Sequence, residues 1–203
     1  MKKTVGILNF NYGNIKSIER SLSNISIDFK FISTKEDLKN ISHLIIPGVG
    51  SFKHFMSQLR KKNMINPIKK FISQKPVLAI CLGMQILFTK SEEFGTIKGL
   101  NILKGTVKKI DKINPNCIVP NIGYLKVRGK TKNKILEKIS NKYYYFAHSY
   151  ACFLKKKYDH LFFDFSKKKY IGLIYHKKIL ATQFHPELSK KNGLNIYKYF
   201  LNF

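Results

Sequence analysis

The segment Val77-Leu78-Ala79-Ile80-Cys81-Leu82-Gly83-Met84-Gln85 decides how this chain folds around a candidate reactive group. Its first four residues are apolar, which is typical of a buried strand, and Met84-Gln85-Ile86-Leu87-Phe88 can begin a helix. Cys81 therefore falls at a strand-to-helix turn. Such a turn, a nucleophile elbow, projects its side chain from a sharp bend and leaves the amides of a helix start nearby.

The residues around Cys81 favour a reactive thiol. Ala79 and Gly83 lie two residues to either side of it, and their small size permits a tight bend. The partial positive charge at a helix start favours the thiolate, which is the nucleophilic form of cysteine. A buried structural cysteine is the competing interpretation, because free cysteine is among the most buried residue types.

A second motif, Gln183-Phe184-His185-Pro186-Glu187, decides between these interpretations. In an extended segment, residues two apart face the same way, so we expect Glu187 to fix the tautomer of His185 while the other ring nitrogen faces Cys81. A Cys-His-Glu triad attacks amides by nucleophilic catalysis, and its histidine returns the proton to the leaving ammonia. We therefore predict Cys81, His185 and Glu187 as catalytic residues.

Length and cysteine content bound the organisation. The 203 residues suit one α/β domain, 1–203, and are too few to add a synthetase domain, so any ammonia produced must be used by another protein. Cys81, Cys117 and Cys152 have irregular spacing, which resembles neither a disulfide framework nor a zinc site. We expect reduced thiols, structural roles for Cys117 and Cys152, no metal, and a cytoplasmic protein without a membrane span.

The charge is strongly positive, since 38 Lys and Arg residues against 11 Asp and Glu residues give a formal +27. Such a charge can attract nucleic acid or anionic membranes. The lysines are spread along the chain without an RNA-binding signature or a basic tail, and phosphate attraction by itself is non-specific. We expect a solvated lysine-rich surface and no specific nucleic-acid site. An acidic partner face, or a phosphorylated substrate held by a partner, would also suit this charge.

Strands and helices alternate in the first half of the chain. Strands are expected at 4–8, 29–32, 43–46 and 77–81, and helices at 15–22, 52–60 and 67–73. Short connections between them predict a mostly parallel sheet flanked by helices. From Gly99 the pattern is β-rich, with strands expected at 100–110, 122–127, 143–150, 161–165, 170–174 and 179–183 and helices at 134–139 and 194–200. We expect this half to extend the same sheet and to return His185 to Cys81.

Three segments that follow predicted strands are expected to meet at one edge of the sheet. They are the loop 9–14, the Gly48-Val49-Gly50 turn and the Cys81 elbow. Chemistry in such sheets gathers at the carboxyl ends of the strands. The glycines let the backbone approach a ligand or adopt positive φ, so the amides of Val49 or Gly50 could join that of Leu82 in an oxyanion hole. An ordinary strand-to-helix turn is the alternative.

Together these motifs carry a family resemblance over nearly the whole chain. They are Asn9-Phe10-Asn11-Tyr12-Gly13-Asn14-Ile15-Lys16-Ser17-Ile18, Pro47-Gly48-Val49-Gly50-Ser51-Phe52, Cys81-Leu82-Gly83-Met84-Gln85, Ser91-Glu92-Glu93, Phe146-Ala147-His148-Ser149-Tyr150 and Phe184-His185-Pro186-Glu187. The chain resembles the class I (triad) glutamine amidotransferases, and within them the glutaminase subunits of imidazole glycerol phosphate synthase. The resemblance implies a single-domain fold with a flavodoxin-like central sheet.

The resemblance also implies a reaction and a substrate site. Cys81 would attack the carboxamide of glutamine, ammonia would leave, and water would hydrolyse the glutamyl thioester, with no cofactor. Glutamine would be held by Gly50, Gln85, Glu92, His148, Ser149 and Tyr150. Gln85 offers a donor and an acceptor, and Glu92 can pair with an α-ammonium group. A solvated helix face is the alternative for Gln85 and Glu92.

The implied partner is a (β/α)8-barrel cyclase subunit that receives the ammonia for histidine biosynthesis, in a heterodimer. The family's usual Pro-His-Met-Gly-Trp-Asn appears here as Pro120-Asn121-Ile122-Gly123-Tyr124-Leu125, and Leu188 stands where lysine is common. Both regions border the synthase interface in the family.

Three alternatives stay open. The first is a paralogous amidotransferase that supplies ammonia for amidination of a surface-polysaccharide sugar. The second is a cysteine peptidase or γ-glutamyl hydrolase of the same fold, against which Gln85 and the segment His148-Ser149-Tyr150 argue. The third is a basic nucleic-acid-binding protein without enzymatic activity.

Overall fold

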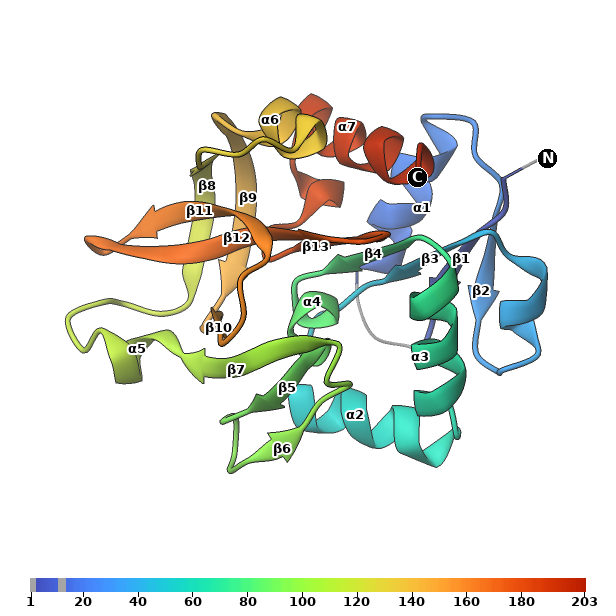
Figure 1. Ribbon diagram of the computed structural model, residues 1–203, viewed down its shortest axis with the longest axis horizontal. Coiled ribbons are helices and arrows are strands. Elements are labelled where there is room, and N and C mark those ends of the chain that lie inside the picture. The colour runs from blue at the N-terminus through green and yellow to red at the C-terminus, as the bar shows by residue number, and fades with distance from the viewer. Residues whose placement is uncertain (1–2, 11–13) are drawn as a thin grey trace.

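A nine-stranded sheet runs through the molecule (Figure 1). The computed structural model describes residues 3–10 and 14–203, so Asn11, Tyr12 and Gly13 of the predicted loop 9–14 lie outside the described residues. The strands are ordered β2-β1-β3-β4-β13-β12-β11-β8-β9. Their bounds are β1 Val5–Leu8, β2 Phe29–Ile32, β3 His43–Ile46, β4 Val77–Ile80, β8 Asn121–Arg128, β9 Lys142–His148, β11 Asp159–Phe165, β12 Lys168–His176 and β13 Ile179–Thr182.

The sheet changes character at β13. From β2 to β13 the neighbouring strands are parallel, and from β13 to β9 they are antiparallel. The parallel half agrees with the alternating pattern of the first half of the sequence. Because β13 pairs in parallel with β4, with Thr182 opposite Ile80, the last strand ends beside the strand that leads to Cys81. The sheet therefore brings the two motifs, about a hundred residues apart, to the same edge.

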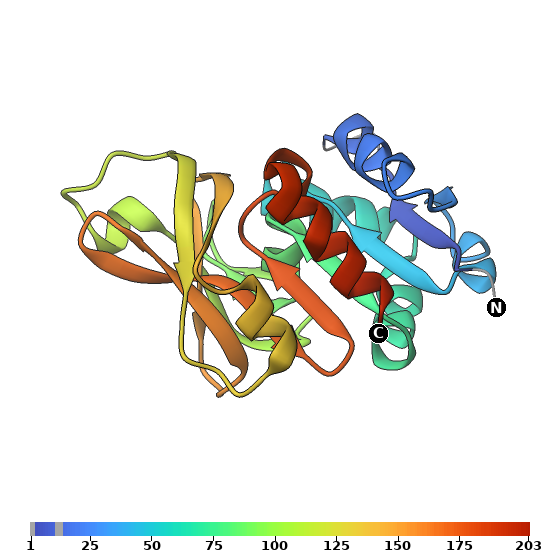
Figure 2. The ribbon, with the colours of Figure 1, turned by 90° about the horizontal axis from the view of Figure 1, so that it is seen from above.

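Helices cover both faces of the parallel half. On one face lie α1 Ile15–Ser23 and α7 Lys190–Leu201, and Figure 2 shows α7 crossing the sheet from above. Next to α7, α6 Lys134–Ile139 covers the antiparallel strands (Figure 1). On the other face lie α2 Phe52–Lys61 and α3 Ile65–Gln74 (Figure 1). Alternate residues of β4 enter two separate cores, since Val77 and Ala79 pack in one and Leu78 and Ile80 in the other. Burial on both sides explains why this strand is continuously apolar.

A second, four-stranded sheet lies beside the first. Its order is β10-β7-β5-β6, with bounds β5 Phe88–Ser91, β6 Ile97–Lys98, β7 Leu103–Lys109 and β10 Tyr150–Leu154. The expectation that the β-rich half extends a single sheet is right for β8, β9 and β11 to β13, and wrong for β7 and β10. The predicted strand at 143–150 is divided at Ser149, where the chain passes from β9 in the large sheet to β10 in the small one.

Some short elements differ from the expectation or were not predicted. The expected helix after Cys81 is α4, Leu82–Ile86, and it ends before Phe88. Phe88 is fully buried in β5 and pairs with Leu103 of β7. Strand pairing and burial thus override the helical pattern of 84–88. The other short elements are α5 Ile110–Ile113 and two 3-10 turns, η1 Asp37–Asn40 and η2 Pro186–Leu188. Among the described residues, no helix is both long and apolar enough to cross a membrane.

Candidate active site

Cys81 lies between β4 and α4, as the sequence predicts. Its backbone has φ 50° and ψ −107°, a sparsely populated conformation for a residue with a side chain. Its amide donates to Thr182 O at 2.7 Å, and its carbonyl accepts from the Gln85 amide at 3.1 Å. These bonds hold the strained turn at the carboxyl end of β4, with the thiol only 7% exposed.

The Pro47–Ser51 turn packs directly against this elbow. A Cβ atom at Gly83 would lie 2.0 Å from Ile46 O, so only glycine permits the elbow to approach β3 so closely. Gly50 has φ +103°, a conformation that favours glycine. A pocket of about 270 Å³ opens at this turn, lined by Val49, Gly50, Ser51, His54 and Phe55. The turn therefore lies against the elbow that carries Leu82, and the oxyanion hole of Val49, Gly50 and Leu82 stays a prediction.

His185 follows the end of β13 and meets Glu187. The distance from His185 Nδ1 to Glu187 Oε1 is 2.8 Å, and the two side chains are 4% and 3% exposed. The expectation of an extended segment is wrong for Glu187, because the chain turns at Pro186 into η2. The turn still brings the carboxylate to the histidine. The His185 amide also donates to Tyr145 O at 2.8 Å, which ties the histidine to β9.

The electrostatics favour a charged His185. Burial alone would lower the pKa of His185, but its interactions with Cys81, both by charge and by a side-chain hydrogen bond, and with Glu187 raise that pKa to about 11. An imidazolium held between a thiolate and a carboxylate is the resting arrangement of a cysteine nucleophile activated by histidine. The structure thus brings Cys81, His185 and Glu187 into one buried cluster.

Gln183 belongs to the site, although it was not among the predicted site residues. Its Nε2 lies 3.5 Å from Cys81 Sγ, and its Oε1 accepts from Gln85 Nε2 at 3.2 Å. A signal was present in the sequence, because Gln183 precedes His185 by two residues in the same motif. The predicted Gln85 is buried in the same place and also donates to Tyr150 O at 3.2 Å.

His148 is in the interior, with both ring nitrogens occupied. Its Nδ1 donates to Tyr150 O at 2.9 Å, which leaves Nε2 to accept from Asn121 Nδ2 at 3.1 Å. Burial lowers the pKa of His148 to about 4, and nearby His185 adds to this effect, so the ring is neutral. His148 therefore connects β8, β9 and β10, and its ring has no free nitrogen for substrate. Ser149 and Tyr150 are partly exposed.

Glu92 and Glu93 point to different places. Glu92 lies 3.5 Å from Lys108 Nζ with its side chain 40% exposed, in a hollow of the small sheet. Glu93 is buried and accepts from the Phe52 amide at 2.5 Å, directly after the Pro47–Ser51 turn. Burial raises the pKa of Glu93. The structure therefore brings Glu93 to the predicted site and leaves Glu92 on the outside.

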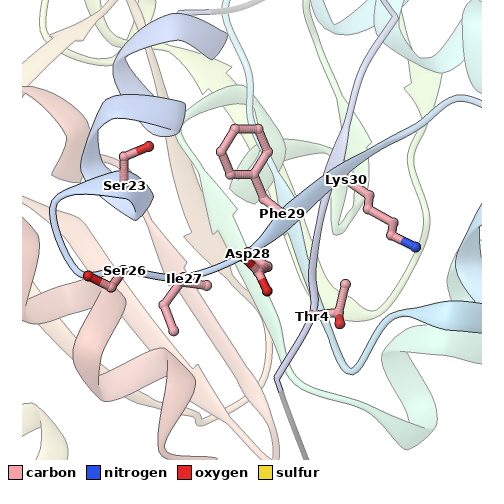
Figure 3. Close-up of a pocket in the computed structure, with 7 residues that line it drawn as sticks. All are labelled: Thr4, Ser23, Ser26, Ile27, Asp28, Phe29 and Lys30. Atoms are coloured by element: carbon pink, nitrogen blue, oxygen red, sulfur yellow. The ribbon is translucent and has the colours of Figure 1, made fainter.

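A separate hollow lies at the other end of the parallel strands (Figure 3). It has a volume of about 730 Å³ and is lined by Thr4, Ser23, Ser26, Ile27, Asp28, Phe29 and Lys30. Thr4 and Asp28 precede β1 and β2, whereas Cys81 follows β4. Since the strands are parallel, the hollow is at the edge opposite the one where such sheets bind substrates.

Cys117 and Cys152 lie in the interior together with Cys81. All three cysteines are free and buried. Among the described residues, no cluster of three or more His, Cys, Asp or Glu side chains could hold a metal ion.

Comparison with known proteins identifies the family. Residues 7–202 match the family described as Glutamine amidotransferase class-I. This chain belongs to the class I glutamine amidotransferases. It is 36% identical over 192 residues to the imidazole glycerol phosphate synthase subunit HisH of Prochlorococcus marinus, covering 93% of this chain and 89% of that protein. The same subunit of Sulfurimonas denitrificans is 35% identical, with 98% of both chains covered.

Another relative is longer than this amidotransferase. The chloroplastic imidazole glycerol phosphate synthase hisHF of Arabidopsis thaliana is 33% identical over 201 residues, which cover 98% of this chain and 34% of that protein. Solved structures share the fold. A glutamine amidotransferase crystal structure superposes with a TM-score of 0.74 at 20% identity, covering 98% of this chain and 97% of the other. PurLQS from Thermotoga maritima gives 0.73 at 15% identity, covering 100% and 99%.

Proposed function

We propose that this glutamine amidotransferase is the glutaminase subunit of an imidazole glycerol phosphate synthase, with a single amidotransferase domain over residues 1–203. Relatives named as that subunit support the assignment over nearly their whole length. The observation that carries the proposed chemistry is the buried cluster of Cys81, His185 and Glu187 beside the Pro47–Ser51 turn. Free, buried thiols suit the reducing cytoplasm in which we place the protein.

The proposed reaction hydrolyses glutamine to glutamate and ammonia. The Cys81 thiolate attacks the carboxamide carbon, and the amides of Leu82 and of Val49 or Gly50 hold the developing oxyanion. His185 gives its proton to the leaving nitrogen, the C–N bond breaks, and a glutamyl thioester remains. His185 then takes a proton from water, whose oxygen attacks the thioester, and Cys81 leaves as the thiolate.

Glutamine is held in this proposal by Glu93 in place of Glu92. Glu93 is a buried carboxylate beside the Pro47–Ser51 turn, and the pKa of Tyr150 is raised by burial and by the Glu93 charge, which puts the two groups in the same neighbourhood. A buried carboxylate of this kind suits an α-ammonium group. The other proposed contacts come from Gly50, Gln85, Ser149 and Tyr150. His148 makes no proposed contact with glutamine and instead donates to the Tyr150 carbonyl.

The proposed partner is a (β/α)8-barrel cyclase subunit in a heterodimer. Exposed apolar side chains on β8, β9 and η2 support this assignment, and we call them the docking surface: Ile122, Tyr124, Tyr143 and Leu188. Tyr124 Oη donates to Leu188 O at 2.7 Å, and Lys190 Nζ lies 5.7 Å from the centre of the Tyr124 ring. The length of the Arabidopsis hisHF protein beyond the matched region is consistent with a second activity that works beside this one.

The departures at Pro120–Leu125 and Leu188 favour one second candidate, a paralogue that supplies ammonia for amidination of a sugar. The chemistry at Cys81 would be the same. Rescue of a histidine auxotroph by this chain together with its own barrel subunit separates the two candidates. Failure to rescue by a stable complex that hydrolyses glutamine would reject the histidine assignment.

The variant Cys81→Ala tests the proposed chemistry. In the complex with the barrel subunit, we expect loss of at least about a thousandfold in glutamine hydrolysis, since no nucleophile remains. Synthase activity with added ammonia should be retained, because that reaction does not need Cys81. Loss of both activities in a folded complex would contradict the proposal, and so would retention of glutamine hydrolysis.

A further inference from the structure

The Gln183 side chain lies directly against the nucleophile. Its Nε2 is 3.5 Å from Cys81 Sγ, and the residue is completely buried after the end of β13. The backbone of Gln183 is fixed as well, because its amide donates to Gly172 O at 2.9 Å. The side chain therefore meets the sulfur from a position set by the large sheet.

Two donors determine which end of the Gln183 amide faces the sulfur. Gln183 Oε1 accepts from Gln85 Nε2 at 3.2 Å and from the Cys152 thiol at 4.0 Å. Burial and the nearby Cys81 raise the pKa of Cys152 well above its ordinary value, so Cys152 stays a thiol and keeps its proton. Because the oxygen is occupied by these donors, the NH2 group is left to face Cys81.

An amide donor at this position has a clear chemical effect. Cys81 is buried, and a buried thiolate needs partners that replace the water it has lost. The elbow helix α4 has only five residues, so the field at its start is weak. We propose that Gln183 is a catalytic residue whose Nε2–H stabilises the Cys81 thiolate, and that Cys152 is a positioning residue that holds the Gln183 amide.

The proposed role differs from that of His185 and rests on the proposed triad. His185 carries the proton that moves during the reaction, whereas the Gln183 amide neither gains nor loses one. Stabilising the thiolate raises the fraction of Cys81 that is ready to attack, and it makes Cys81 a better leaving group when water attacks the thioester. Once the thiolate is fully formed, the same hydrogen bond does not speed its attack.

The experiment is the pH dependence of Cys81 alkylation by iodoacetamide, followed by mass spectrometry of the peptide that contains Cys81. The full chain carries Gln183→Met, which keeps a similar length and removes the donor. The matched control is Asn114→Leu. Asn114 directly follows α5, and the substitution removes a buried amide that donates to Ser166 O at 2.9 Å. This readout needs neither glutamine nor the partner subunit.

For Gln183→Met we expect the midpoint of the alkylation profile to move up by about one pH unit. At pH values below the midpoint, alkylation should be about tenfold slower than in the wild type. A change of this size corresponds to the loss of one hydrogen bond to a charged group. The plateau at high pH should equal or exceed that of the wild type. Asn114→Leu should leave the midpoint unchanged. Cys152→Ser should behave as the wild type, and Cys152→Ala should show a smaller shift in the same direction as Gln183→Met.

Two results would overturn the inference. One is a Gln183→Met profile that superimposes on the wild type, and the other is an equal shift in Asn114→Leu, which would indicate a general loss of stability. Glutamine turnover by the complex supplies a second measurement. For Gln183→Met, kcat should fall about tenfold, and KM should change less than kcat. If the wild type hydrolyses no glutamine, the proposed function fails, while the alkylation profiles still test the role of Gln183.

Discussion

The cluster around Cys81 at the carboxyl end of β4 and the docking surface on β8, β9 and η2 differ in whether their side chains find partners inside the chain. At the elbow, every polar group of Cys81, His185 and Gln183 that takes part in the proposed chemistry has a partner inside the chain. On the docking surface, Ile122 is 63% exposed, and the isolated chain contains nothing that requires an apolar residue there. Burial therefore supports the proposed chemistry, and the group of exposed apolar side chains supports the proposed place of a partner.

Hydrogen bonds join the two regions. Asn121 precedes Ile122 on β8 and bonds to His148, which bonds to the Tyr150 carbonyl. That carbonyl also accepts from Gln85, which donates to Gln183 beside Cys81. A partner seated on β8 would thus contact a strand that is connected to Cys81 by consecutive hydrogen bonds. Substitutions in the two regions are expected to differ in the size of their effects.

The largest effect is expected at His148, where the two regions meet. Its pKa is about 4 in the folded chain, against 6.5 for the ordinary side chain. Between pH 6.5 and pH 4, His148 is protonated in the unfolded chain and neutral in the folded chain. The stability that a neutral His148 contributes is therefore present above pH 6.5 and is lost as the pH falls to 4. The full loss corresponds to about 3 kcal/mol.

Chemical denaturation of His148→Gln should therefore show a smaller fall in unfolding free energy between pH 7 and pH 4 than the wild type. Part of the fall will remain, because burial also lowers the pKa of His43 to about 4. His54→Gln, on the exposed side of α2, serves as the control and should keep the wild-type pH dependence. An unchanged slope in His148→Gln would show that this ring is not held neutral.

The next effect distinguishes buried from exposed acids. Glu93→Gln should raise KM for glutamine by about thirtyfold, since a charge-assisted hydrogen bond to a buried ammonium group is worth about 2 kcal/mol. Glu92→Gln is the matched control one residue away, and it should change KM by less than about twofold, because exposed ion pairs contribute little. Steady-state kinetics of the complex decide the matter. A larger rise in KM for Glu92→Gln than for Glu93→Gln would show that Glu92, and not Glu93, binds glutamine.

The smallest effect is expected on the docking surface. Ile122→Asp should weaken the complex with the barrel subunit by about tenfold or more, because a charge would then be buried without a partner in the interface. Phe31→Asp is the control, since Phe31 is 45% exposed on β2 at the opposite edge of the large sheet. Calorimetric titration with the barrel subunit compares them. Equal affinities for both variants would move the interface away from β8.

Much of the fold follows from local pattern. The strands 29–32 and 43–46 and the helix 134–139 are predicted with the bounds that the structure gives them, because apolar alternation and short connections determine such elements. The strand at 143–150 is predicted as one element and is two, and β5 is not predicted, since its first residue, Phe88, falls at the end of the expected helix. Both errors involve the small sheet. Its strands are stabilised by partners far along the chain, and their own sequence carries little sign of that pairing.

The site divides in the same way. The proposed triad of Cys81, His185 and Glu187 can be predicted from the sequence, because nucleophilic catalysis requires particular residue types beside particular turns. Glu93, Gln183 and the interior position of His148 are decided by the tertiary structure. Neighbouring residues such as Glu92 and Glu93 are chemically alike, and only strand pairing and packing determine which of them faces the elbow. Residue types and their spacing are enough to predict nucleophilic chemistry at Cys81, because that chemistry is local, whereas the packing of the two sheets fixes which side chains surround it.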